Sequence, residues 1–309
     1  MLPLWALSLL RPARASKLAT EKRQQAAAVQ KITPQPFAVQ THHFQDRYDH
    51  WTDAHNHLHD PRLGDPGPLV AAMKLAGVTR CVVNATRESD WPAVENLATA
   101  YPDFVVPAFG IHPWHAHTAS AGWQEKLRSV LEKHPRASIG ECGLDHWITD
   151  PPLEVQRLVF IDQLRLAREL DRPLTLHCLK AWGALLDAFA EAPPPTRFLM
   201  HSFGGSIEIA RRLLTFGAFF SFSGHFLHPR KSAVLEVFRQ LPPDRILLET
   251  DAPDMLPPET IITHPLPENH NHPANLPAIG LALAAALGMT AEALAELTRE
   301  NAQRCFGFF

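Results

Sequence analysis

Short apolar runs alternate with longer segments of helical period along most of this 309-residue chain. Eight such runs predict strands over 51–55, 80–84, 104–110, 137–141, 173–177, 197–201, 218–223 and 245–251. Helical periods predict helices over 68–76, 123–134, 153–170, 205–216, 232–240, 275–287 and 291–306. Eight strand–helix units in about 260 residues are the count and size of an α/β fold of the TIM (β/α)8 barrel type.

The predicted strands are continuously apolar, which is typical of a sheet buried on both faces. A doubly wound parallel sheet is the alternative, because periodicity alone does not show closure. The proline-rich segment 253–273, directly after the eighth strand, is too long for a simple connection. We expect it to form an ordered loop over the mouth of the barrel.

The first 45 residues differ from the rest of the chain. Residues 2–10 are apolar and precede Arg-Pro-Ala-Arg-Ala, which is similar to a signal peptide, but no Lys or Arg comes before the apolar run. We therefore predict a poorly packed leader over residues 1–45 and one barrel domain over residues 46–309. A cleaved signal peptide is the alternative for the leader.

Charge and cysteine usage narrow the class of protein. Residues 51–309 hold 22 Lys and Arg against 29 Asp and Glu, which disfavours generic binding to nucleic acid or anionic membranes through a basic surface. No apolar run reaches transmembrane length. The four cysteines have no CxxC spacing, so we expect free thiols and a reducing, cytoplasmic location.

Two histidines end the first strand, in Asp53-Ala-His55-Asn-His57. Residues two apart on a strand point to the same side, so His55 and His57 can present two imidazoles to one metal ion. Asp53 or a backbone carbonyl would orient a ring from behind. In a chain with 18 histidines, the same spacing also arises by chance or as a surface pair.

Further candidate ligands end other predicted strands: Glu141 the fourth, His177 the fifth, His201 the sixth and Asp251 the eighth. In a TIM barrel these positions converge on one face, where catalytic groups are found. Clustered imidazoles and carboxylates would repel one another or stay unsatisfied without a cation, so the pattern predicts metal ions.

Six protein ligands exceed what one open catalytic ion needs. We predict two divalent ions, with Zn²⁺, Mn²⁺, Ni²⁺, Fe²⁺ or Mg²⁺ as candidates, bridged by Glu141 and a hydroxide. Asp251 is predicted to take the proton from the attacking water and deliver it to the leaving group. Glu141 and Asp251 are thus the candidate catalytic residues.

With these residues in place, the sequence resembles the TatD family of metal-dependent hydrolases, which are amidohydrolase-like TIM barrels. The resemblance runs from about Thr52 to Phe306 and is carried by residues 53–58, 110–113, 139–145, 176–177, 201–206, 221–224, 248–253 and 273–277. It implies that one metal ion is held by His55, His57, Glu141 and Asp251, and the other by Glu141, His177 and His201. It also implies that His112 lies beside the substrate.

Two departures from the family bear on the substrate. The family usually has Ser-Arg-Asp after the fifth-strand histidine, whereas this chain has Cys178-Leu179-Lys180, so an arginine that would contact phosphate is absent. Lys180 is the candidate replacement, although an ammonium is a point charge and not a bidentate fork. Residues 269–272 are Asn-His-Asn-His, where the family usually has Arg or Lys and Asn-Glu. These losses weaken the case for a polyanionic substrate.

We predict a metal-dependent hydrolase that cleaves phosphodiesters in the manner of TatD-like deoxyribonucleases, with DNA or a small phosphodiester as substrate. The first alternative keeps the two ions and changes the bond to an amide or ester. The second is a metal-binding docking module that has lost turnover. Trp114 and Trp147, which follow the third and fourth strands, either line the pocket or pack the loops.

Overall fold

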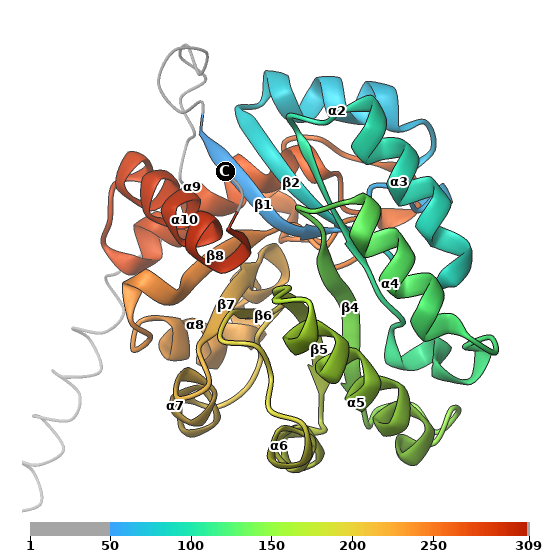
Figure 1. Ribbon diagram of the computed structural model, residues 1–309. Coiled ribbons are helices and arrows are strands. Elements are labelled where there is room, and N and C mark those ends of the chain that lie inside the picture. Colours follow the sequence, from blue (N-terminus) through green and yellow to red (C-terminus); the bar gives the residue numbers. More distant parts are fainter. Residues whose placement is uncertain (1–49, 308–309) are drawn as a thin grey trace, which may run out of the picture. The chain divides into compact units, whose positions relative to one another are not determined.

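The computed structural model describes residues 50–307, and the predicted leader over residues 1–45 lies outside them. Within this range the chain forms eight parallel strands surrounded by helices (Figure 1). The strands are β1 (Trp51–Asn56), β2 (Val78–Asn84), β3 (Val105–Phe109), β4 (Ser138–Asp145), β5 (Leu174–Leu179), β6 (Phe198–Met200), β7 (Ala218–Ser223) and β8 (Ile246–Glu249). All eight lie within one or a few residues of the runs predicted from sequence.

Helices connect successive strands and cover the outside of the sheet. They are α2 (Pro66–Leu75), α3 (Trp91–Ala100), α4 (Trp123–Lys133), α5 (Leu153–Glu169), α6 (Trp182–Glu191), α7 (Ile207–Leu214) and α8 (Ser232–Phe238), followed after β8 by α9 (Leu276–Leu287) and α10 (Ala291–Phe306). Helices α3 and α6 were not named among the predicted helices, and they complete the alternation that the strand count required.

The strands are arranged in the order of the chain, from β1 to β8, with every neighbouring pair parallel. This order excludes the doubly wound alternative, in which the strand order reverses at a switch point. The two ends of the sheet meet just beyond β8, where Asp251 N donates to His55 O and His57 N donates to Ala252 O. These bonds close the barrel at the same end as the predicted metal ligands.

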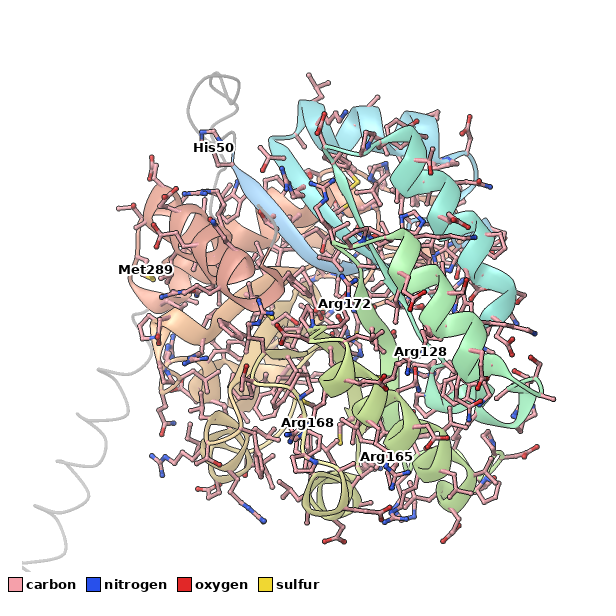
Figure 2. All side chains as sticks on the ribbon, viewed as in Figure 1. His50, Arg128, Arg165, Arg168, Arg172 and Met289 are labelled. Carbon is pink, nitrogen blue, oxygen red and sulfur yellow. The ribbon has the colours of Figure 1, made fainter. Side chains whose placement is uncertain are left out.

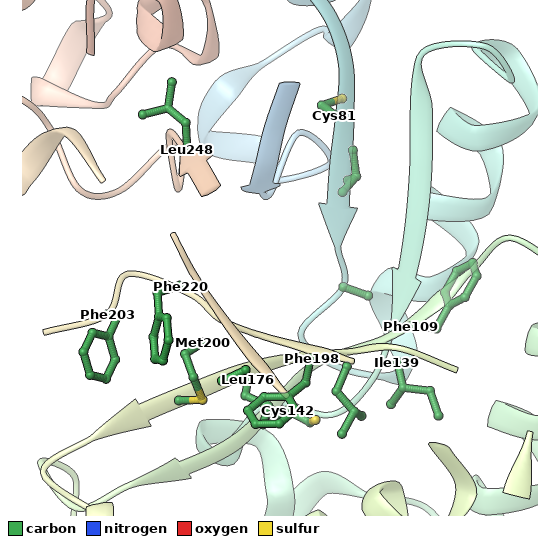
Figure 3. Close-up of a cluster of buried hydrophobic side chains, with 14 of the residues drawn as sticks. Cys81, Phe109, Ile139, Cys142, Leu176, Phe198, Met200, Phe203, Phe220 and Leu248 are labelled. Carbon is green, nitrogen blue, oxygen red and sulfur yellow. The ribbon is translucent and has the colours of Figure 1, made fainter. Parts of the chain in front are cut away.

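Two apolar layers hold the barrel together. The inner layer fills the barrel with small and branched side chains, among them Ala54, Val82, Val106, Leu199 and Leu247, and α10 packs beneath them. The outer layer lies between strands and helices, and Figure 3 shows part of it around Phe109, Ile139, Leu176, Phe198, Met200 and Phe220. Six of the strands contribute apolar side chains to both layers, as their sequences indicated, whereas β4 and β5 contribute them to the outer layer only.

Local sequence explains where several helices begin and end. Asp65 caps α2, since its carboxylate accepts a hydrogen bond from Gly67 N, and a proline follows in the first turn. Thr290 caps α10 in the same way, and Gly307 ends that helix in a left-handed conformation. On the outer face, Arg128 of α4, labelled in Figure 2, forms an ion pair with Glu169 of α5 at 2.7 Å.

The segment after β8 is ordered by its asparagines. Asn275 Oδ1 accepts from the backbone N–H groups of Thr263 and His264, and Asn271 donates to Thr250 O beside the end of β8. Among residues 50–307, no single helix is long and apolar enough to cross a membrane. Residues 273–287 and 291–306 reach that length and composition only together, and they are bent by 107° at their break.

Candidate metal centre

The fold brings all six predicted metal ligands together at the C-terminal end of the barrel. His55 lies in β1, Glu141 in β4 and His177 in β5. His57 and His201 directly follow β1 and β6, and Asp251 is the second residue after β8. Five of the six are buried, and His177 is partly buried. Their donor atoms belong to overlapping clusters that could hold metal ions. Two sets of imidazoles face the two oxygens of Glu141, His55 and His57 at Oε2 and His177 and His201 at Oε1.

The first group consists of His55, His57, Asp251 and one oxygen of Glu141. His55 Nε2 lies 3.2 Å from His57 Nε2 and 3.3 Å from both Glu141 Oε2 and Asp251 Oδ1. His57 Nε2 lies 3.3 Å from Glu141 Oε2 and 3.5 Å from Asp251 Oδ1. Ligands held about 2.1 Å from a tetrahedral ion lie about 3.4 Å from one another. The spacing of these four atoms therefore fits a single cation between them.

The second group is built on the other oxygen of Glu141. Glu141 Oε1 lies 2.9 Å from His201 Nε2 and 3.2 Å from His177 Nδ1, and the two imidazole nitrogens are 3.1 Å apart. Three donors leave at least one coordination position open, which is the arrangement that a catalytic metal site requires. The carboxylate of Glu141 thus faces donors on both of its oxygens.

Hydrogen bonds behind two of the rings decide which nitrogen faces the site. His57 Nδ1 lies 2.8 Å from the carbonyl of Asn84, and His177 Nε2 lies 3.1 Å from Asp145 Oδ2. A carbonyl or carboxylate oxygen only accepts, so each of these nitrogens carries the proton and the opposite nitrogen presents a lone pair to the site. Of the two orienting groups predicted for β1, the backbone carbonyl is the one found behind His57.

Asp53, which was a candidate for orienting a histidine ring, has a different role. Its carboxylate accepts from the backbone N–H and the hydroxyl of Thr250, at 3.0 and 2.6 Å, and from the Asn56 amide. These bonds join β1 to the residues after β8. Asp53 therefore fixes the closure of the barrel beside the two histidines.

The site attracts positive charge. Burial alone would lower the pKa of the His55 imidazole, but the carboxylates of Glu141 and Asp251 raise it to about 9. Burial alone would raise the pKa of Glu141, yet the surrounding histidines lower it well below its ordinary value. Carboxylate oxygens and imidazole nitrogens this close together repel one another through their lone pairs unless a proton or a metal cation lies between them. The donor set is the one that divalent transition metals prefer.

His112 reaches the same carboxylate, and its donor atom lies within 4.8 Å of those of Glu141 and His177. Its Nδ1 accepts from the backbone N–H of Trp114 at 3.2 Å, so the neutral ring carries its proton on Nε2, which lies 3.3 Å from Glu141 Oε1. Burial, together with the neighbouring His177, lowers the pKa of His112 to about 4, although Glu141 opposes this shift. The neutral ring is therefore a donor on the open side of the second group.

Lys180, the predicted replacement for a phosphate-binding arginine, lies outside the ligand cluster. It is exposed just after β5, and its Nζ lies 3.9 Å from the centroid of the Trp147 ring. His272 offers no replacement cation, because its Nδ1 accepts from Ala274 N and burial lowers its pKa to about 4.

Three residues that serve the site were not predicted to do so. Asp145 holds His177, Asn84 supplies the carbonyl behind His57, and Glu249 accepts from the backbone N–H of Ser202, next to His201. Asp145 and Asn84 are the last residues of β4 and β2, so their position at strand ends was a signal that could have found them.

The fold and the clustered histidine and carboxylate donors define the class: a TIM-barrel metal-dependent hydrolase. The profile of the TatD-related DNase family matches residues 52–307. This chain belongs to the TatD family, and it is a metal-dependent hydrolase of that type.

Individual relatives agree with this assignment. A 3'-5' ssDNA/RNA exonuclease TatD from Pantoea ananatis is 33% identical over 248 residues, covering 79% of this chain and 94% of the relative. The crystal structure of YjjV, a TatD homologue from Escherichia coli, is 29% identical, covers 84% of this chain and 98% of its own, and has a TM-score of 0.76. A TatD family hydrolase from Entamoeba histolytica shares the fold, with a TM-score of 0.74 at 18% identity over 84% of this chain and 98% of its own.

Proposed function

We propose that this protein hydrolyses phosphodiester bonds in single-stranded nucleic acid, with two divalent ions held by the shared carboxylate site. The observation that carries the proposal is the position of Glu141, whose two oxygens each face a separate set of imidazole donors. A carboxylate in that position suits a bridge between two ions. The exonuclease activity in the name of the Pantoea relative supports the choice of bond and substrate.

Within this proposal the ligands divide into two sets. His55, His57, Asp251 and Glu141 would hold one ion, and His177, His201 and Glu141 the other. Ions bound there would activate a water molecule and polarise a phosphoryl oxygen. Zn²⁺, Mn²⁺ and Mg²⁺ are the ions to test, and the imidazole-rich donor set favours Zn²⁺ or Mn²⁺ over Mg²⁺.

The residues of the chain then carry the proton and orient the substrate. Asp251 Oδ1 lies among the first group of donors, and the pKa of this carboxyl, which burial would raise, is lowered by His55 and His57. It is ionised at neutral pH and is placed to accept a proton from the attacking water and return it to the leaving oxygen. His112 Nε2–H is placed to donate to a phosphoryl oxygen on the open side.

The experiment is a substrate and metal panel with purified full-length protein. Single-stranded DNA, RNA, duplex DNA, bis(p-nitrophenyl) phosphate and a set of esters and amides are each tested with Mg²⁺, Mn²⁺ and Zn²⁺. We expect cleavage of single strands and about two ions per chain by elemental analysis. Labelling the 5' end would show whether products shorten from the 3' end.

A matched pair of variants links turnover to the site. Asp251→Asn removes the proposed base, whereas Asp254→Asn changes an exposed carboxylate three residues later, whose partner is Arg62. Loss of cleavage only in Asp251→Asn supports the proposal. Turnover of esters or amides without any phosphodiester cleavage would refute it and favour the alternative bond.

A further inference from the structure

Exposed aromatic side chains gather beside one part of the metal centre. In the described part of the chain, five large apolar side chains are exposed: Leu75, Trp114, Trp147, Leu158 and Leu179. Three of these, Trp114, Trp147 and Leu179, lie at or just after the C-terminal ends of β3, β4 and β5. That is the face of the barrel on which the ligands converge, so this apolar surface adjoins the site and is not scattered over the helices.

Asp145 connects the two tryptophans to the metal centre. Its Oδ2 accepts from Trp114 Nε1 at 2.7 Å and from His177 Nε2 at 3.1 Å, and its Oδ1 accepts from the Trp147 backbone N–H at 2.7 Å. One buried carboxylate therefore fixes an indole ring, a second loop and a metal-ligating imidazole. Their relative positions are set before any substrate binds, which reduces the entropy lost on binding.

Both indoles keep much of their surface in water despite these bonds. Trp114 is 50% exposed and Trp147 is 65% exposed, although tryptophan usually buries most of its large ring. A role in packing the loops would cover these faces. An exposed aromatic face next to a hydrolytic centre is instead suited to a planar ligand.

A single cation accompanies this aromatic surface. Lys180 Nζ lies 3.9 Å from the centroid of the Trp147 ring, in a cation–π contact that holds the ammonium at the rim while leaving it exposed. A flat aromatic face with a positive charge beside it complements a nucleotide, whose base stacks and whose phosphate is anionic.

We propose that Trp114, Trp147 and Lys180 form a nucleotide-binding subsite on the β3–β5 side of the metal centre, which stacks an unpaired base and contacts its phosphate. The inference rests on the proposed function and specifies how the substrate is recognised. Stacking requires a base that is not covered by a partner strand, so the subsite selects single strands. It also accounts for substrate binding without the arginine that is missing after His177.

The experiment compares base-bearing and abasic substrates on the metal-loaded, full-length enzyme. KM is measured for oligothymidylate and for an oligonucleotide of equal length that carries tetrahydrofuran abasic residues. Trp147→Ala is the main variant, because only the backbone of Trp147 binds Asp145 and the removal of its ring leaves that bond intact. Leu75→Ala is the matched control, since Leu75 is 76% exposed on α2 and has no part in the proposed subsite.

We expect Trp147→Ala to raise KM for oligothymidylate about tenfold and to change KM for the abasic strand by less than about twofold. Leu75→Ala should leave both values unchanged. Trp114→Ala should also remove the preference for bases, and Trp114→Phe should retain most of it, because phenylalanine keeps a stacking ring but loses the N–H that binds Asp145. The same comparison can be made for binding alone. Fluorescence anisotropy of labelled oligothymidylate and of the labelled abasic strand gives the Kd of each for metal-loaded Asp251→Asn, which is expected not to cleave them.

Two failures are distinguishable. In the first case, the wild-type enzyme cleaves oligothymidylate, but Trp114→Ala and Trp147→Ala have the same ratio of KM for the abasic strand to KM for oligothymidylate as the wild type. That result refutes the subsite and leaves the proposed function standing. If the wild type neither cleaves nor binds either oligonucleotide, the proposed function and the subsite fall together.

Discussion

A sharp prediction concerns the carboxylate of Asp145, because it holds the proposed metal ligand His177 from behind. Burial on its own would raise its pKa, but the bonds from His177, Trp114 and the Trp147 backbone lower the pKa to about 2. The group is therefore ionised at neutral pH, and its bond to His177 Nε2 is charge-assisted. Asp145→Asn keeps the size of the side chain while removing the charge and one acceptor.

The size of the effect follows from the three donors that Asp145 accepts. In Asp145, one oxygen accepts from the Trp147 backbone and the other from Trp114 and His177. In asparagine, an NH₂ group replaces one of these oxygens, and it donates but cannot accept, so the donors on that side lose their acceptor. A hydrogen bond to a charged group contributes about 1.5–3 kcal/mol. At about 1.4 kcal/mol per tenfold change, we expect metal affinity at the His177 group to fall by about 10- to 100-fold.

Isothermal titration of metal-free protein with Zn²⁺ or Mn²⁺ tests this prediction. The wild type should show two binding events, and Asp145→Asn should weaken one of them while sparing the other. Activity at limiting metal should fall and should recover at high metal concentration. Asp162→Asn is the control, since Asp162 accepts hydrogen bonds on the outer face of α5. Equal affinities in Asp145→Asn and wild type at both steps would refute the role given to Asp145.

Three further predictions concern other carboxylates. Asp251→Asn should reduce kcat by at least about 100-fold with an unchanged circular dichroism spectrum, and retained turnover would remove Asp251 as the base. Glu249→Gln should lower the free energy of unfolding by about 1–3 kcal/mol in urea titrations of metal-free protein, because the buried Glu249 carboxylate accepts from Ser221 and the Ser202 backbone; an unchanged midpoint would contradict this. The pKa of Asp90, which burial would raise, is lowered below its ordinary value of 3.8 by the neighbouring His59 imidazole and by hydrogen bonds from Thr86 and Arg87. The ionised Asp90 carboxylate therefore stabilises the fold fully above pH 3.8, and this stabilisation is lost as pH falls. Asp90→Asn should flatten the acid side of the plot of unfolding free energy against pH. An unchanged acid side would show that Asp90 does not make these interactions.

That the proposed metal ligands cluster could be predicted because they follow a rule of the fold. Strands 51–55, 137–141, 173–177, 197–201 and 245–251 each carried a histidine or carboxylate at or near their predicted C-terminal end. In a parallel barrel those ends share one face, so position along the strand was enough to predict that these side chains meet. The structure places them within hydrogen-bonding distance of Glu141 or of one another.

The supporting residues were harder to predict because their partners lie far away in sequence. Asp145 acts on His177, 32 residues away, and the Asn84 carbonyl acts on His57, 27 residues away. Asp53 lies next to the histidines of β1, yet it binds Thr250, 197 residues away. The identity of such a partner depends on strand register, which the sequence of one strand does not specify.

Two of the ligands owe their direction to irregular strands. Ala54 packs in the inner core and Ile139 in the outer core, so strict alternation would direct the side chains of His55 and Glu141 away from the barrel interior. The pairing register shifts at this point in both β1 and β4. Such irregularities re-aim side chains and are common beside active sites, and here both side chains reach the site.

The sequence by itself determined the barrel class, the strand ends that carry the proposed metal ligands and the resemblance to a family, because these depend on local periodicity and residue type. The tertiary structure alone decided which nitrogen of each ring faces the site, that Glu141 joins two groups of donors, and that Trp114 and Trp147 share Asp145 with His177. These features arise from contacts between distant strands. Their geometry depends on register and on two local shifts in pairing, which residue type and spacing do not encode.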